Sequence, residues 1–125
     1  METAGPALVT VVDDDESVRE SLPDLLRELG FAVQAFSSAE TFLESEAINH
    51  TDCLILDIAM PGMSGPELQR ELQRRNRRIP IIFITAQADE TLLQQLLERG
   101  AVAYLFKPFN EAALLDALQR ALRRG

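Results

Sequence analysis

Three acidic side chains with the potential for chemistry each stand at the end of an apolar segment. Asp13 and Asp14 follow the segment 7–12, and Asp57 ends the segment 53–57. A carboxylate at the end of a strand is often a harmless surface group, and an acid just before a helix can cap that helix. Three carboxylates at one place, in contrast, cannot all stay ionised without a cation nearby. What these acids do therefore depends on the elements that position them.

Five short segments rich in Val, Ile and Phe predict β-strands, and helical patterns lie between them. The strands are expected at 7–12, 31–36, 53–57, 81–85 and 102–106. The helices are expected from Val18 to Leu29, from Ser37 or Ser38 onward, and at about 64–75, 89–99 and 110–123. Strands joined by helices form parallel sheets that are covered on both faces. The sequence predicts an α/β fold, a flavodoxin-like doubly wound (βα)5 sandwich with strand order 2-1-3-4-5.

The composition is that of one soluble globular domain. The chain has 125 residues, of which 46% are hydrophobic and 26% charged, and its net charge is −8. That charge argues against direct nucleic-acid binding, which needs clustered Lys and Arg. The sequence has no apolar stretch near the roughly 18 residues of a membrane span and no basic signal-peptide start. We therefore expect a single cytoplasmic domain over 1–125, away from membranes, with residues 1–6 flexible and no output domain in the chain.

The predicted strand order brings the three acids together. Strands 1 and 3 are neighbours about 5 Å apart, so Asp13, Asp14 and Asp57 meet where the winding of the sheet reverses. Thr85 and Lys107 follow strands 4 and 5 at the same edge. An all-oxygen ligand set suits Mg²⁺, with Mn²⁺ as an alternative. A cation, an ammonium and a hydroxyl beside a carboxylate form a place where that carboxylate can attack a phosphoryl group.

Four motifs at the ends of predicted strands resemble those of a known family. They are the acid pair 13–14, LDIAMPGMSG at 56–65, FITA at 83–86 and YLFKPF at 104–109. Over its length from residue 11 to the last helix, the chain is similar to receiver domains of two-component response regulators. The sequences of its motifs are closest to those of FixJ-type receivers. Each motif alone is weak evidence for the family, but four motifs in this order and spacing, each at the end of a predicted strand, are strong evidence.

The resemblance implies a phosphorylation site. Asp57 would accept a phosphoryl group from a sensor histidine kinase, and Thr85 and Lys107 would contact that group. The ligands of the Mg²⁺ ion would be Asp14 and Asp57 directly, Asp13 through water, and the backbone carbonyl of Ala59. The Lys107–Pro108 peptide would be cis.

The resemblance also implies a switch. On phosphorylation the Thr85 hydroxyl would move, and Tyr104 would turn inward as the switch aromatic. We expect Ala59 and Gln87 to flank the path of the hydrolytic water and to tune dephosphorylation. The predicted fourth helix carries more leucines than one face needs, at positions 92, 93, 96 and 97. We expect some of them to be exposed, and the phosphorylated domain to form a homodimer through the face of helix 4, strand 5 and helix 5.

Two other functions remain open on the residues alone. A Mg²⁺-dependent phosphohydrolase of the haloacid-dehalogenase kind also uses an aspartyl nucleophile, but it needs a second Asp where this chain has Ala59. A receiver-like binding module that is never phosphorylated would not need the complete set of acids, Thr85 and Lys107. We therefore expect a signalling domain that assists its own phosphorylation and dephosphorylation, and not an enzyme.

Overall fold

The computed structural model describes residues 5–123 and contains one five-stranded parallel sheet. The strands are β1 (Leu8–Val12), β2 (Ala32–Phe36), β3 (Cys53–Asp57), β4 (Ile81–Thr85) and β5 (Ala103–Phe106). Their order is β2-β1-β3-β4-β5, which confirms the predicted fold class and strand order. The predicted flexible segment 1–6 falls mainly on residues 1–4, which lie outside the described residues.

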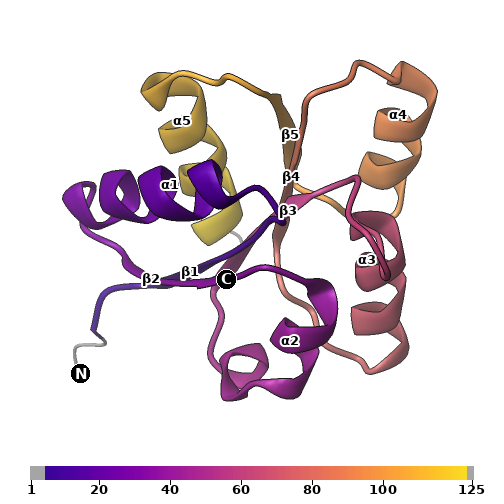
Figure 1. Cartoon of the computed structure of the whole chain (residues 1–125), viewed down its shortest axis with the longest axis horizontal. Coiled ribbons are helices and arrows are strands. Elements are labelled where there is room, and N and C mark those ends of the chain that lie inside the picture. The colour runs from indigo at the N-terminus through magenta and orange to yellow at the C-terminus, as the bar shows by residue number, and fades with distance from the viewer. Residues whose placement is uncertain (1–4, 124–125) are drawn as a thin grey trace.

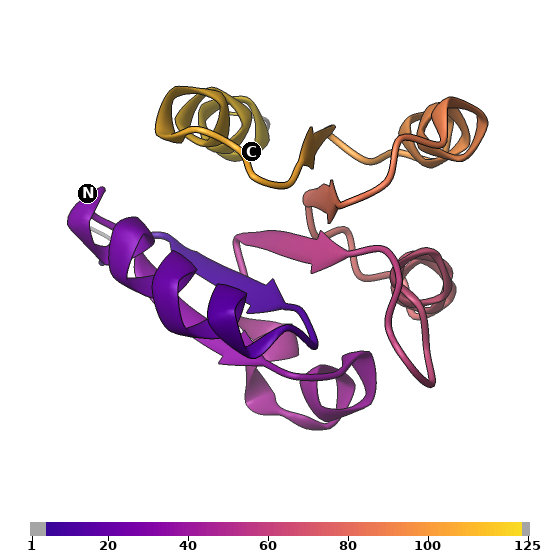
Figure 2. The ribbon, with the colours of Figure 1, turned by 45° about the horizontal axis from the view of Figure 1, so that its top comes forward.

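Helices cover both faces of the sheet. They are α1 (Glu16–Glu28), α2 (Ala39–Glu44), the 3₁₀ turn η1 (Glu46–Asn49), α3 (Gly65–Arg74), α4 (Glu90–Glu98) and α5 (Glu111–Leu122). In Figure 1, α1 and α5 lie on one side of the sheet, and α2, α3 and α4 lie on the other. The turned view in Figure 2 shows the same two groups. The molecule is therefore a three-layer sandwich.

The central strand β3 is apolar at successive positions because both of its faces are buried. In β3, Leu54 and Leu56 face the layer of α2, α3 and α4, whereas Cys53 and Ile55 face α1 and α5. All four side chains are fully buried, as expected for a strand covered on both faces. Burial raises the pKa of the Cys53 thiol to about 12, so this cysteine stays protonated and serves packing.

Side-chain caps fix where the helices begin. Asp15 caps α1 by accepting a hydrogen bond from the Ser17 amide, the role its position indicates. Ser64 and Glu67 form a reciprocal capping box at the start of α3. Because α1 and α3 start directly after the loops that leave β1 and β3, these caps also end the loops that carry the acids.

The prediction that leucines of α4 are exposed is wrong. Leu93 and Leu96 are each only 1% exposed, and Leu92 and Leu97 are half-buried against the same core cluster. More than one face of α4 is covered, because the same cluster includes side chains of α3 and Tyr104 of β5. Among residues 5–123, the large apolar side chain that is exposed is Phe106 on β5, at 43%.

Candidate functional site

The three acids meet at the carboxyl edge of the sheet. Val12 pairs with Leu56, so Asp13 and Asp57 come level on neighbouring strands. Each of Asp13, Asp14 and Asp57 offers a carboxylate oxygen, and these atoms lie within 4.8 Å of one another. Asp13 and Asp57 are buried, whereas Asp14 is exposed at the mouth of the cluster. This cluster is named the acidic pocket below.

Backbone contacts hold Asp13 in place. Its amide donates to the carbonyl of Phe36, and its Oδ1 accepts from the amide of Asp15 at 2.9 Å. Its own carbonyl accepts a 3.0 Å hydrogen bond from the guanidinium of Arg19, which comes from α1. The sequence analysis missed this contribution of Arg19, since an arginine six residues away in a helix carries no local sign of it.

Lys107 reaches the acidic pocket from the end of β5. Its Nζ lies 2.9 Å from Oδ2 of Asp13 and 3.5 Å from Oδ1 of Asp57. The Lys107 amide donates to the carbonyl of Thr85, and the Lys107–Pro108 peptide is cis. Burial lowers the pKa of Lys107, but the two carboxylates raise it by more, so it lies above its usual value and the side chain is a cation.

The surroundings of Asp57 in the pocket raise its pKa. Burial raises its pKa to about 7, and the charge of Asp13 adds to the effect. The ammonium of Lys107 acts in the opposite direction but only in part. A single lysine is therefore not enough to keep all the carboxylates of this pocket ionised.

The residues of the acidic pocket fit a hard divalent cation. The buried Oδ2 of Asp13 has no hydrogen bond of good geometry in the described part of the chain, and the Lys107 ammonium is its ion-pair partner. The donor set is entirely carboxylate oxygen, the chemistry that Mg²⁺ prefers. Ala59, the remaining candidate ligand, lies exposed in the loop two residues beyond Asp57.

The loop from Ile58 to Ser64 connects Asp57 to α3, and three contacts shape it. The Gly65 amide donates to the carbonyl of Ile58 at 2.9 Å, which closes the loop on itself. A Cβ atom at Gly65 would collide with the backbone carbonyl of Asp57, so only glycine fits there. The third contact is a 2.9 Å hydrogen bond from the Met63 amide to Oε2 of Glu40 in α2.

Thr85 ends β4, and Tyr104 lies on the adjacent strand β5, where it pairs with Phe83. The Thr85 hydroxyl donates to the carbonyl of Gln87 and accepts from its amide, both at 3.1 Å. Tyr104 is half-buried, and its ring meets that of Phe106 edge to face, with centroids 5.6 Å apart. Gln87 is exposed in the loop after β4. The two switch candidates therefore lie on adjacent strands, with the Thr85 hydroxyl engaged by its own loop.

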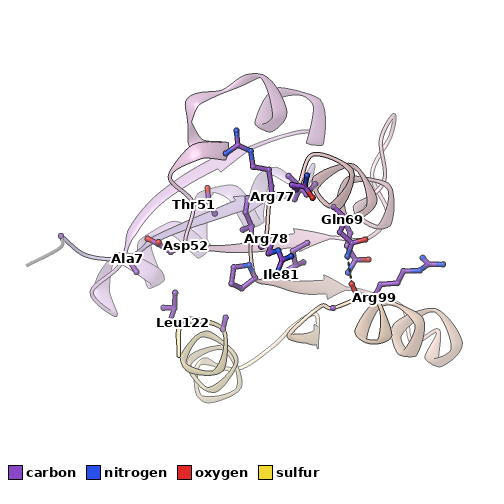
Figure 3. Close-up of a pocket in the computed structure, with 17 residues that line it drawn as sticks. Ala7, Thr51, Asp52, Gln69, Arg77, Arg78, Ile81, Arg99 and Leu122 are labelled. Atoms are coloured by element: carbon purple, nitrogen blue, oxygen red, sulfur yellow. Dashed lines mark hydrogen bonds between the residues drawn. The ribbon is translucent and has the colours of Figure 1, made fainter. Parts of the chain in front are cut away.

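A depression of about 900 Å³ lies away from the acidic pocket. It lies at the opposite edge of the sheet, where its lining includes Asp52 and Pro80, which directly precede β3 and β4, and Gly100 in the loop that leads to β5. Figure 3 shows that Arg77 and Arg99 project away from each other at two ends of this depression. The positive charges of these two side chains therefore do not converge on one point of the depression.

The fold and the acidic pocket define a class of protein, and comparisons with known proteins agree. Residues 9–119 match the family described as the response regulator receiver domain. The chain belongs to this family. The described residues include no helix that is long and apolar enough to span a membrane.

Individual relatives place the chain near FixJ-like regulators. It is 46% identical over 123 residues to Nodulation protein W of Bradyrhizobium diazoefficiens, covering 98% of this chain and 54% of that protein. It is 40% identical to the transcriptional regulatory protein FixJ of Azorhizobium caulinodans, covering 94% of this chain and 56% of that protein. The chain thus spans about half the length of these curated relatives.

Solved structures give the same picture. The crystal structure of FixJ-N matches with a TM-score of 0.85 and 36% identity, covering 100% of this chain and 98% of that one. The response regulator StyR matches with a TM-score of 0.88 and 48% identity, covering 96% of this chain and 61% of that one. Receiver domains act as phosphorylation-dependent switches in signalling and bind Mg²⁺ at their acidic pocket, so the phosphohydrolase alternative is not favoured.

Proposed function

We propose that this chain is switched by phosphorylation of Asp57, with the phosphohistidine of a sensor kinase as the donor. An Asp57 carboxylate oxygen attacks the phosphorus atom, the P–N bond breaks, and the electron pair stays on the imidazole nitrogen. The observation that carries the proposal is the Lys107 ammonium, which lies within 3.5 Å of Asp57 in a pocket that gathers three carboxylates.

The side chains around Asp57 have separate roles in this proposal. Asp14 and Asp57 would hold Mg²⁺ directly, Asp13 would hold it through water, and the Ala59 carbonyl would complete the protein ligands. When bound, Mg²⁺ supplies positive charge that neutralises the phosphoryl oxygens. Lys107 pairs with the same oxygens, and its positive charge, together with that of Mg²⁺, favours the ionised form of Asp57 that a nucleophile requires.

The switch begins at Thr85. The phosphoryl group adds up to two negative charges and strong acceptors near the Thr85 hydroxyl. That hydroxyl leaves the Gln87 backbone, whose hydrogen bonds hold it in the free protein, and donates to the phosphoryl group instead. Tyr104 on the neighbouring strand then turns inward. A preference of a few kcal/mol is enough to shift the population.

The proposed readout is the surface of α4, β5 and α5. Phe106 lies exposed on β5 and packs against Tyr104, so a movement of the Tyr104 ring changes this surface. We infer that the phosphorylated domain pairs with itself through an isologous contact there, or contacts an output domain. Ala59 and Gln87 tune the lifetime of the phosphoryl group. The domain acts in the cytoplasm as a signalling module, without catalytic turnover of a separate substrate.

Intact-mass spectrometry with acetyl phosphate and Mg²⁺ tests the proposal. The wild-type chain should gain roughly 80 Da for one phosphoryl group, and Asp57→Asn should not. Asp15→Ala is the matched control, because Asp15 caps α1 and should leave labelling intact. A wild-type chain that gains no mass would favour the binding module that is never phosphorylated, and labelling of Asp57→Asn would contradict the assignment of the nucleophile.

A further inference from the structure

One side chain outside the acidic pocket holds the loop that carries Ala59. Glu40 lies in the first turn of α2, and its Oε2 accepts the 2.9 Å hydrogen bond of the Met63 amide. The two residues are 23 positions apart in the sequence, so this bond joins α2 to the loop after β3. A hydrogen bond to a carboxylate is stronger than one between neutral groups.

The backbone of the loop passes very close to this carboxylate. Gly62 has a φ of +74°, and a Cβ atom built there would lie 2.6 Å from the same Oε2 of Glu40. The backbone angle favours glycine, and a Cβ atom here would push the Glu40 carboxylate out of its present position. The turn at residues 62 and 63 fits against the carboxylate, so the contact is specific in shape as well as in charge.

Other contacts of the loop leave one part of it without support from the core. Met60 is buried in the core cluster that also contains Phe42 of α2, and the Gly65 amide closes the far end of the loop. Between these points the loop is exposed at Pro61 and Gly62, and the Met63 side chain packs against the same cluster but is only partly buried. Glu40 is the side chain that reaches this exposed part from another element.

We propose that Glu40 is a positioning residue of the metal site. By holding the Met63 amide it orders the loop that carries the Ala59 carbonyl, so that this ligand is in place before the cation arrives. An ordered loop loses less conformational entropy on binding, and affinity rises accordingly. The inference rests on the proposed function, because it takes the Ala59 carbonyl as a Mg²⁺ ligand.

Glu40 acts through the backbone in this proposal and does not bind the ion. The group of acids close enough to share a cation, among residues 5–123, consists of Asp13, Asp14 and Asp57, without Glu40. A purely electrostatic effect of its negative charge would be lost equally in Glu40→Gln and Glu40→Ala. The hydrogen bond, in contrast, survives in Glu40→Gln, because the amide oxygen still accepts.

The test compares Glu40→Ala and Glu40→Gln with Glu44→Ala, a control at an exposed position of the same helix. Calorimetric titration with Mg²⁺ alone measures affinity, and hydrogen exchange of the Met63 amide in the metal-free protein measures order in the loop. Glu40→Ala should weaken Mg²⁺ binding about threefold to tenfold and speed Met63 exchange, whereas Glu40→Gln and Glu44→Ala should stay within about twofold of the wild type.

The outcomes separate this inference from the proposed function. A loosened Met63 amide with unchanged Mg²⁺ affinity in Glu40→Ala would overturn the role of Glu40 and leave the metal site standing. Equal losses of Mg²⁺ affinity in Glu40→Ala and Glu40→Gln would also overturn this role. They would show that Glu40 acts through the long-range effect of its negative charge. A wild-type chain that fails to bind Mg²⁺ would contradict the proposed metal site itself.

Discussion

Lys107 and Asp13 form an ion pair of 2.9 Å that spans the sheet from the end of β5 to the end of β1. The same ammonium is farther from Asp57, at 3.5 Å. In the free protein Lys107 therefore compensates mainly the fully buried carboxylate of Asp13. The proposed phosphorylation of Asp57 would add negative charge near the same ammonium, and we expect Lys107 to change its principal partner then.

Removal of Lys107 should destabilise the fold. Lys107→Ala leaves Asp13 buried without its cation, and we expect a loss of about 1–3 kcal/mol in the free energy of unfolding. Urea unfolding at neutral pH without Mg²⁺ measures it. Arg120→Ala is the control, because the Arg120–Asp116 pair is exposed and should contribute little. Equal effects of the two variants would show that the Lys107–Asp13 pair does not stabilise the fold.

Neutralisation of Asp57 should stabilise the metal-free fold in a pH-dependent way. The pKa of Asp57 is raised to about 7, so the folded protein holds this proton more tightly than the unfolded chain does. The resulting loss of stability is absent below about pH 4, grows as pH rises, and is complete above about pH 7. Asp57→Asn does not titrate and avoids that loss.

We expect Asp57→Asn to raise the free energy of unfolding by roughly 1–3 kcal/mol at pH 8. This is less than the full pKa shift would give, because solvent at the mouth of the pocket screens the charge of Asp57. It should shrink toward zero near pH 4. Urea unfolding across this pH range without Mg²⁺ tests it, with Asp24→Asn on the exposed surface of α1 as the control. A gain that does not depend on pH would mean that the raised pKa is not the cause.

The two neighbouring acids Asp14 and Asp15 should separate metal binding from capping. Asp14→Ala should weaken Mg²⁺ binding by about tenfold or more, because it removes a carboxylate of the acidic pocket. Asp15→Ala removes the cap of α1 and should leave Mg²⁺ affinity nearly unchanged. A calorimetric titration of both variants decides this, and equal losses would mean that capping and ligation are not separable here.

Phe106 should control self-association of the phosphorylated domain. Replacing this exposed ring by Ser removes the large apolar contact of the proposed interface, so we expect dimerisation to weaken by about tenfold or more. Sedimentation with and without phosphodonor measures the change. Arg77→Ser, at the opposite edge of the sheet, is the control. Phosphorylated wild-type protein that stays monomeric at high concentration would point to an output domain as the partner.

The sequence was informative where local pattern decides structure. The apolar run of β3 and the alternation of strands and helices predict the sheet order, and the order alone brings Asp13 level with Asp57. Pattern could not predict how much of α4 is covered, since that depends on the placement of α3 and Tyr104. It also gave no sign of the Glu40–Met63 bond, because a carboxylate in a helix and an amide 23 residues away share no local motif.

The environment of Tyr104, which includes its contact with Phe106, can be followed by the fluorescence of this tyrosine. The sequence contains one tyrosine and no tryptophan, so its near-ultraviolet emission is dominated by the Tyr104 ring. That ring is half-buried and stands at 73° to its phenylalanine neighbour, in a setting that is sensitive to rotation. Tyrosine fluorescence of an unlabelled sample therefore follows the environment of this one side chain, and stopped flow after addition of phosphodonor would time the proposed inward turn.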